Sequence, residues 1–409
     1  MWKSLNGYDR CMFGVLLLLT AASNTSTGGA SIGICLGALV MLVQGIRKRS
    51  LPGMDKGIGI VIGIYILLWA IASCFSLDPA HSFRELWATA YRFLPLCFAM
   101  MYLRERWQLR WLWLAFALSV FVDETKALWQ YATFQDLGWG HRPTGFNHSP
   151  TFLASHMLMA IPVLFFAAGR DCMKPKERGF LLLTALVAVL VLILSGTRGG
   201  WLAFLGTAVL YAVCDKTYRK KAAVAVVFLL MALCLAALGS PSFQARMLTM
   251  TDPSYQSNSE RLLMWQSAAE IIRDYPLTGV GMDEFGLAYN TKYISPLAKE
   301  RAESPEKYWT GHGHPHNNFL KMFSEGGILG LGAFLLLHGY FLWRYCRIWR
   351  QERHAFPYGL MGVLVLSALM LEGMTDTNMN QVPIMREYWL LSGIVFAASG
   401  MGAGIGKNE

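Results

Sequence analysis

Long blocks of apolar residues, separated by short polar stretches, recur along almost the whole chain. Most blocks have about 17–25 residues, roughly the number that an α-helix needs to cross the hydrocarbon core of a bilayer. Of the 409 residues, 54% are hydrophobic and only 15% are charged. This leaves too few polar side chains to cover the surface of a soluble protein of this length. The pattern therefore predicts an all-α polytopic membrane protein.

About twelve transmembrane helices are expected, including a short first one and a glycine-rich last one. They are predicted at 11–22, 29–46, 57–75, 86–103, 109–132, 150–168, 179–196, 199–214, 221–239, 318–344, 357–373 and 388–404. Lys3 and Arg10 precede the first block, as in a signal peptide, but the many spans that follow favour an uncleaved first helix.

Positive charge is concentrated in every second loop. The basic residues of these loops are Arg47, Lys48, Arg49 and Lys56; Arg104, Arg106 and Arg110; Arg170, Lys174, Lys176 and Arg178; Lys216, Arg219, Lys220 and Lys221; and Arg344, Arg347, Arg350 and Arg353. Because cytoplasmic loops are enriched in lysine and arginine, the alternation predicts that these loops and both termini face the cytoplasm. Topology thus explains the formal net charge of +10, and no nucleic-acid partner is expected.

One long polar segment, 240–317, interrupts the apolar blocks. It separates nine predicted spans in residues 1–239 from three in residues 318–409. The charge alternation places this segment outside the cytoplasm. Within it, apolar residues at helical spacing predict a helix over 259–272 that ends before Tyr275.

Three histidines, His312, His314 and His316, alternate at the end of this segment. Pro315 favours an extended backbone at the preceding residue, and an extended run would place the three rings on one face. The run can be interpreted as a metal site, as a general base, or as ordinary polar residues at a loop end. A metal site is disfavoured because none of the eight cysteines lies in 240–317 and none forms a CxxC pair. We expect neither a bound metal ion nor a disulfide.

Arg198 lies between two predicted spans that are joined by almost no loop. An arginine at membrane depth costs free energy unless it has a partner. It can snorkel to the interface. However, Gly199 and Gly200 would let a ligand approach, and the following helix would direct its N-terminal N–H groups outward. We favour an anion site over snorkelling.

Arg261 is a second candidate on the same side of the membrane. It lies in the first turn of the predicted helix, where a cation opposes the helix dipole. The alternative is an exposed charge, or an ion pair with Glu260 or Asp283.

Arg142, in the polar stretch after the fifth span, and Arg92, inside an apolar span, are further candidates. For each, the alternative is a structural ion pair with an acidic residue such as Glu372 or Asp376.

Several arginines and a histidine are therefore expected at the non-cytoplasmic mouth of a helical bundle. Arginines stabilise phosphate charge, and a histidine can accept a proton from a hydroxyl. This combination suits transfer to an alcohol from a donor with a phosphate or diphosphate leaving group. The chain has no phosphate-binding loop and no dinucleotide fingerprint, and a lipid-linked donor that enters from the bilayer would need neither.

Four motifs occur in order around the polar segment. They are Ser195-Gly196-Thr197-Arg198-Gly199-Gly200; Ser259-Glu260-Arg261-Leu262 with Trp265; Pro276-Leu277-Thr278-Gly279-Val280-Gly281; and His314-Pro315-His316-Asn317-Asn318-Phe319-Leu320 with Glu325-Gly326-Gly327-Ile328-Leu329-Gly330. Together they resemble the O-antigen ligase and O-antigen polymerase superfamily, and Arg142-Pro143-Thr144-Gly145 resembles another short motif of that family. The resemblance implies a bacterial inner-membrane, inverting glycosyltransferase of the GT-C-like class, with short helices in one long periplasmic loop.

In the ligase branch, the resemblance implies transfer of a glycan from undecaprenyl diphosphate to lipid A–core oligosaccharide at the periplasmic face, without a metal ion or other cofactor. Arg198 and Arg261, with Arg142, would bind the diphosphate or the substrate. His316 would orient or deprotonate the acceptor hydroxyl, with His314 as the second choice.

Other activities fit the same motifs. An O-antigen or exopolysaccharide polymerase and a protein O-oligosaccharyltransferase share the donor and differ in the acceptor. A lipid-linked glycan transporter belongs to a different class, and Arg92 and Lys126 would suit it. The residues capable of chemistry lie on one side of the membrane, which favours an enzyme over alternating access.

Overall fold

The computed structural model describes most of the chain. The residues that it describes fold almost entirely into helices, with one isolated β-bridge between Gly138 and Arg142. The structure describes residues 5–138, 141–214, 255–302, 313–352 and 354–402, and the single positions 220, 227, 231, 244, 248 and 252. The all-α prediction is confirmed for this part of the chain.

Five helices among the described residues are long and apolar enough to cross a bilayer: α2 (Thr27–Lys48), α3 (Lys56–Cys74), α7 (Pro150–Ala168), α8 (Pro175–Leu194) and α15 (Asn318–Gln351). The shorter apolar helices include α9 (Arg198–Cys214) and α16 (Tyr358–Glu372). The bundle also contains α1 (Gly7–Ala22), α6 (Arg106–Thr133) and α17 (Val382–Gly402). These helices support a polytopic membrane protein. The count of about twelve spans stays a prediction, and the span expected at 221–239 lies outside the described residues apart from two single positions.

The span expected at 86–103 is not one continuous helix. α4 (Pro79–Ala90) leads into a 3₁₀ turn at Tyr91–Phe93, and α5 (Leu94–Tyr102) follows. Pro95 lies in the first turn of α5, where its missing N–H breaks no intrahelical hydrogen bond. Hydropathy does not reveal this break, because the residues on both sides of it are apolar.

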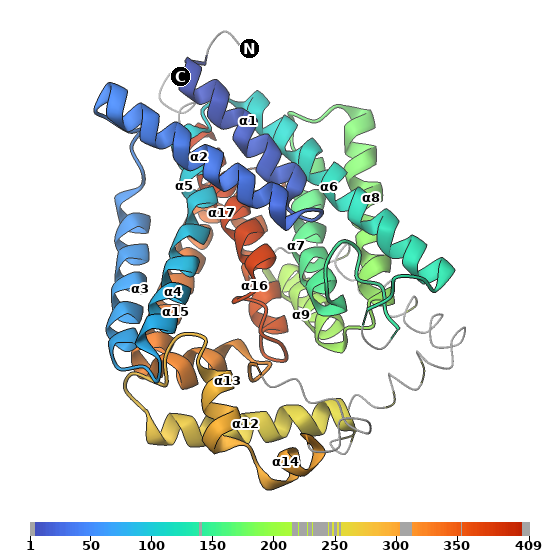
Figure 1. Cartoon of the computed structure of the whole chain (residues 1–409). Coiled ribbons are helices and arrows are strands. Elements are labelled where there is room, and N and C mark those ends of the chain that lie inside the picture. The colour runs from blue at the N-terminus through green and yellow to red at the C-terminus, as the bar shows by residue number, and fades with distance from the viewer. Residues whose placement is uncertain are drawn as a thin grey trace.

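The described part of the polar segment, 255–302 and 313–317, covers one end of the bundle (Figure 1). Its main helix is α12 (Gln256–Asp274), which begins earlier than the predicted residue 259 and ends before Tyr275 as expected. The short helices α13 (Phe285–Ala288) and α14 (Pro296–Ala302) lie beside it. Met264, Ile271 and Phe285 form part of a small separate core, and Leu320 of α15 packs against it. This core fixes α12 against the start of α15.

Two glycines let the segment after α12 lie directly on α15. Gly279 and Gly327 have φ of 65° and 59°, and a Cβ at either one would lie 2.3 Å and 2.2 Å from the other segment's backbone. Backbone hydrogen bonds join the segment after α12 to α15. The N–H of Val280 donates to the carbonyl of Ser324 (3.0 Å), and the N–H of Ile328 donates to the carbonyl of Pro276 (2.9 Å). α15 is kinked at Gly327 for this reason.

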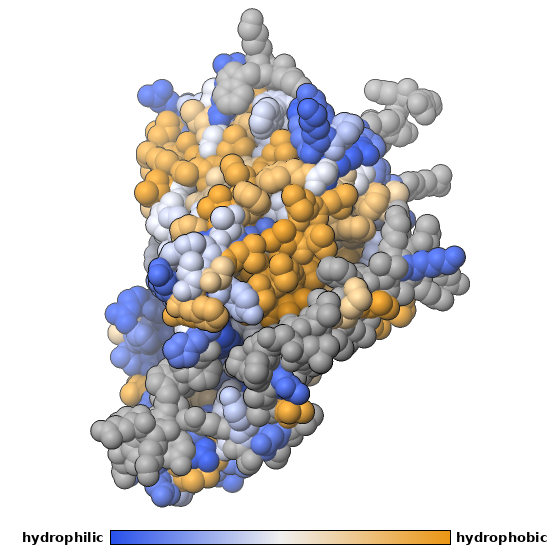
Figure 2. Space-filling view, turned by 90° about the vertical axis from the view of Figure 1, so that its right-hand side faces the viewer, coloured by the Kyte–Doolittle hydropathy of each residue, from blue (hydrophilic) through white to orange (hydrophobic). Residues whose placement is uncertain are grey.

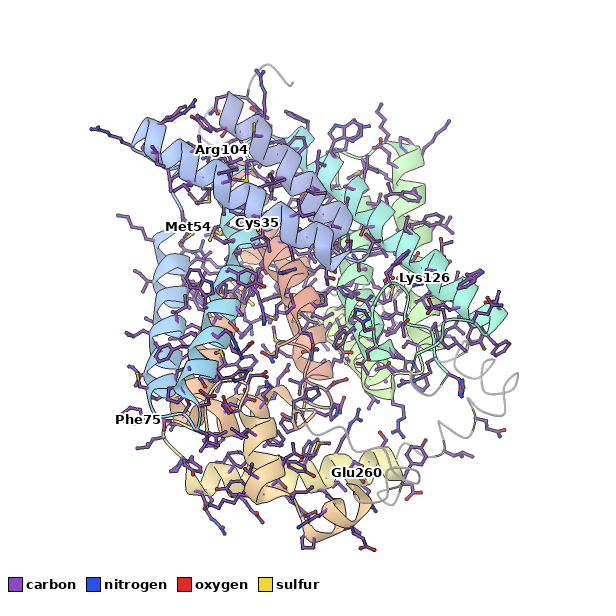
Figure 3. All side chains as sticks on the ribbon, in the orientation of Figure 1. Cys35, Met54, Phe75, Arg104, Lys126 and Glu260 are labelled. Carbon is purple, nitrogen blue, oxygen red and sulfur yellow. The ribbon has the colours of Figure 1, made fainter. Side chains whose placement is uncertain are left out.

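Described residues of four of the basic loops gather at the opposite end of the bundle. Arg344 of α15 donates to Asp55 at the start of α3 (2.8 Å), and Arg170 after α7 donates to a backbone carbonyl before α16 (2.8 Å). In Figure 3, Arg104 lies at this upper end and Glu260 of α12 at the lower end. Figure 2 shows apolar side chains gathered across the middle of one face. The orientation of the two ends in the membrane remains a prediction.

Candidate active site

His316 stands at the turn that leads into α15. Its φ of 47° lies in the left-handed region, which costs free energy for a residue with a Cβ. Asn317 caps the helix by accepting from the N–H groups of Phe319 (2.9 Å) and Leu320 (3.0 Å). The turn brings the His316 ring to the loop between α16 and α17, where Nδ1 lies 3.1 Å from Oδ1 of Asp376.

The Asp376 carboxyl is held in its charged form. Burial would raise its pKa, but the hydrogen bond and charge of His316, together with the charge of Arg261, hold this pKa well below its ordinary value. Asp376 is therefore a carboxylate at neutral pH, and Nδ1 of His316 carries the proton that it donates. In the neutral imidazole with its proton on Nδ1, the other ring nitrogen, Nε2, has a lone pair that can accept a proton.

His314 packs edge-on against His316, with 4.4 Å between ring centroids. Burial, followed by repulsion from His316, lowers the pKa of His314 to about 4. Its Nδ1 is buried and has no hydrogen-bond partner among the described residues. His316 is therefore the histidine with the carboxylate partner that suits a general base, and His314 lies beside it. His312 lies outside the described residues.

α12 brings two side chains to the histidine loop. Nε1 of Trp265 donates to the carbonyl of Pro315 (2.8 Å), which fixes the loop from the side opposite the bundle. Arg261 lies about one turn earlier on the same helix, and its charge acts on Asp376. A cation therefore stands close to the histidine–carboxylate pair.

The carboxylates expected as partners of Arg261 are engaged elsewhere. Glu260 binds Arg301 (2.6 Å), and Asp283 binds Lys321 (2.9 Å). No carboxylate forms an ion pair with Arg261 within the part of the chain that the structure describes. Its half-buried guanidinium can thus meet an anion.

Arg198 is the first residue of α9 and also contacts the polar segment. Its side chain donates to Oδ1 of Asn258 (2.9 Å) and lies over the ring of Tyr255 at 5.4 Å. The start of α9 also touches the loop that carries Asp376, because a Cβ at Gly199 would lie 2.1 Å from Oγ1 of Thr375. The helix N-terminus and its arginine therefore face the same region as the histidine loop.

Arg142 occupies a different position. It is buried, and it donates to the carbonyls of Ser195 (3.3 Å) and Gly196 (3.5 Å), in the turn just before Arg198. Gln130 of α6 accepts two backbone N–H bonds from the loop that carries Arg142. Arg142 thus supports the turn that presents Arg198.

Residues 183–335 match the family model described as O-antigen ligase. The chain carries a domain of the O-antigen ligase superfamily. The matched range contains Arg198, Arg261, His314 and His316. This family indicates a membrane enzyme of the ligase or polymerase type that acts on lipid-linked glycans. No curated protein matches the chain.

The matched range ends at residue 335, before Asp376. A chain of hydrogen bonds nevertheless joins the loop that carries Asp376 to this domain. Oε2 of Glu372 accepts from Ser155 (2.6 Å) and from Asn378 (2.9 Å), and Asn378 accepts from Asn318 (2.7 Å). These bonds tie the loop after α16 to the first residue of α15. Asp376 is thereby held at a fixed place opposite the histidine turn.

In the alternative interpretation of Arg92 and Arg142, Asp376 and Glu372 were possible partners of these arginines. Their side-chain hydrogen bonds among the described residues come instead from His316, Ser155 and Asn378. The only signal in the sequence was a polar run, 375–378, between two apolar spans. That run marks a loop but does not identify the histidine that it contacts.

Proposed function

We propose that the protein is an O-antigen ligase, an inverting and metal-independent glycosyltransferase. It moves O-antigen glycan from undecaprenyl diphosphate to lipid A–core oligosaccharide at the periplasmic face of the inner membrane, with both termini in the cytoplasm. The observation that carries the proposal is the contact between Nδ1 of His316 and Oδ1 of Asp376 (3.1 Å), at the same mouth of the bundle as Arg198 and Arg261. The basic loops at the opposite end support the orientation.

His316 acts as the general base in this reaction. Its Nε2 takes the proton of the acceptor hydroxyl as the hydroxyl oxygen attacks the anomeric carbon of the donor sugar. The new glycosidic bond forms on the face opposite the diphosphate, while the bond from carbon to the diphosphate oxygen breaks and its electron pair leaves with that oxygen. A single displacement inverts the anomeric configuration. Asp376 stabilises the imidazolium that forms.

Arg198 and Arg261 stabilise the charge that develops on the diphosphate. Arg198 combines its guanidinium with the positive end of the α9 dipole. Arg261 approaches from α12, so the leaving group would lie between two elements that are distant in sequence. Both groups are in place before the bond breaks, which makes their stabilisation of the transition state effective.

A transporter of lipid-linked glycan would need cations available inside the bundle. Arg92 is buried but donates to the carbonyl of Asn380 (3.1 Å). Lys126 pairs with Asp136 (3.1 Å) near the end of α6. Both cations have structural partners, which supports the enzyme over the transporter.

The decisive experiment is glycan transfer by the purified protein from undecaprenyl-diphosphate glycan. Lipid A–core, a second lipid-linked glycan and an unglycosylated acceptor protein are offered in separate reactions, each with EDTA. We expect product with lipid A–core and an inverted linkage by NMR. Product only with the second glycan would identify a polymerase, and product only with protein an O-oligosaccharyltransferase. A strict requirement for added metal would contradict the metal-independent mechanism.

A further inference from the structure

A cleft of about 900 Å³ opens at the end of the bundle opposite His316. Four arginines line it: Arg106 of α6, Arg170 after α7, and Arg344 and Arg347 of α15. The start of α16 and the end of α17 complete its wall. Ligand sites in proteins usually have volumes of about 300–1,000 Å³. The cleft is therefore large enough to hold a ligand.

The carboxylates in this cleft already have partners. The pairs are Asp55 with Arg344 (2.8 Å), Asp171 with His354 (3.3 Å) and Glu352 with Arg170 (4.0 Å). Within the described ranges, Arg106 and Arg347 form no ion pair with any carboxylate. Two guanidinium groups from two different helices thus remain to meet an anion inside one cleft.

Aromatic side chains hold two of the cleft arginines, Arg170 and Arg347, in place. The guanidinium of Arg170 lies 3.8 Å from the ring centroid of Tyr358, and that of Arg347 lies 5.7 Å from the ring centroid of Trp343. Such contacts reduce the conformational entropy that an arginine loses when it binds a ligand.

The general preference for basic residues in cytoplasmic loops explains the charge but not the cleft. That preference requires only that arginines lie near the membrane surface. Arg106, Arg347 and Arg350 are all exposed, but Arg350, on the same helix as Arg347, meets this requirement without lining the cleft. The arrangement of Arg106 and Arg347 around a shared volume therefore calls for a ligand of its own.

We propose that this cleft binds a phosphate-bearing anion and that Arg106 and Arg347 are its principal ligands. The guanidinium fork matches pairs of phosphate oxygens. The headgroup of an anionic phospholipid and a soluble diphosphate both present this chemistry. The site lies at the other end of the bundle from Arg198 and Arg261, so it is separate from the diphosphate site of the proposed reaction.

The test follows the unfolding temperature of the full-length protein in neutral detergent by tryptophan fluorescence. An Arg198→Gln/Arg261→Gln background removes any response from the proposed diphosphate site. Phosphatidylglycerol and inorganic diphosphate are titrated separately, with sodium chloride at equal ionic strength as the reference. We expect at least one anion to raise the unfolding temperature above the salt reference. A response to phosphatidylglycerol alone identifies a lipid headgroup, and a response to diphosphate alone identifies a soluble ligand.

Variants of the cleft then locate the response. In the same background, Arg106→Gln with Arg347→Gln should weaken the apparent affinity at least about tenfold, and Arg350→Gln should leave it unchanged. Lysine at both positions keeps the charge but loses the forked guanidinium. The affinity of this double lysine variant should therefore lie between that of the background protein and that of the double glutamine variant. An unchanged affinity in the double glutamine variant, an equal loss in Arg350→Gln, or no response beyond salt would overturn the proposal.

Discussion

Two histidine–carboxylate pairs lie at the same end of the bundle and differ mainly in their surroundings. His316 meets Asp376 at 3.1 Å, and His81, near the start of α4, meets Glu284 at 2.7 Å. The side chains are 25% and 12% exposed in the first pair, and 28% and 3% exposed in the second. The pKa of Asp376 is nevertheless lowered, whereas the pKa of Glu284 is raised.

The neighbouring charges differ in sign between the two pairs. Burial raises the pKa of both carboxyls. Around Glu284, burial raises the pKa more than the hydrogen bond and charge of His81 lower it. The charges of Asp78 and Asp283 raise it further. Around Asp376, the charge of Arg261 acts with the histidine and the pKa falls. A basic environment keeps Asp376 ionised and attracts an anionic substrate, so the neighbours of the pair, rather than the pair itself, mark the candidate site.

Removal of the two histidines should give the largest contrast. His316→Ala should lower kcat for glycan transfer by about 10²–10⁴-fold, the usual contribution of a general base. His81→Ala, the matched control, should leave transfer nearly unchanged because no arginine approaches its carboxylate among the described residues. Initial rates with lipid A–core as acceptor measure both effects. Equal losses in the two variants would remove the distinction between the pairs.

Neutralising the carboxyls should give the next largest contrast. Asp376→Asn should lower kcat by roughly 10²-fold, because the ring of His316 remains but loses the charge that fixes its tautomer and stabilises the imidazolium. Glu284→Gln should retain most of the activity. The pH profile of kcat should change only in Asp376→Asn. If the profile keeps its shape in Asp376→Asn while less folded protein is recovered, Asp376 has only a structural role.

The sequence predicts the helices of this protein better than it predicts the pairings within the site. Apolar blocks specify helices because only helices satisfy backbone polar groups inside a bilayer without forming a closed sheet. Polar residues that remain at the block ends, such as Arg198 and His316, are costly enough to indicate a site. The contact of His316 with Asp376 joins positions 60 residues apart, and it depends on how α15 and α16 pack. The kink of α15 at Gly327 likewise depends on a tertiary contact.

A smaller effect should follow from loosening the loop that carries Asp376. Asn378→Ala removes hydrogen bonds to Glu372 and Asn318 and leaves buried polar groups unpaired. We expect kcat to fall about tenfold, equivalent to ~1.4 kcal/mol in the activation barrier, with KM little changed. Asn290→Ala, at an exposed position of the polar segment, is the control. A rise in KM with normal kcat would indicate that Asn378 contributes to substrate binding instead.

The smallest effect, and the most direct test of the comparison, is the pH dependence of stability. The folded-state pKa of Asp376 lies below its ordinary value of 3.8, so its stabilising contribution is present above that value and is lost as pH falls toward the folded-state pKa. The folded-state pKa of Glu284 lies above 4.5, so its carboxylate costs stability at neutral pH, and this cost disappears as pH falls through the folded-state pKa. The wild-type protein should therefore lose stability relative to Asp376→Asn as pH falls below 3.8, and gain stability relative to Glu284→Gln as pH falls toward 4.5 from above. Unfolding temperatures from tryptophan fluorescence measure both trends, and trends of the same sign would show that neighbouring charges do not separate the two pairs.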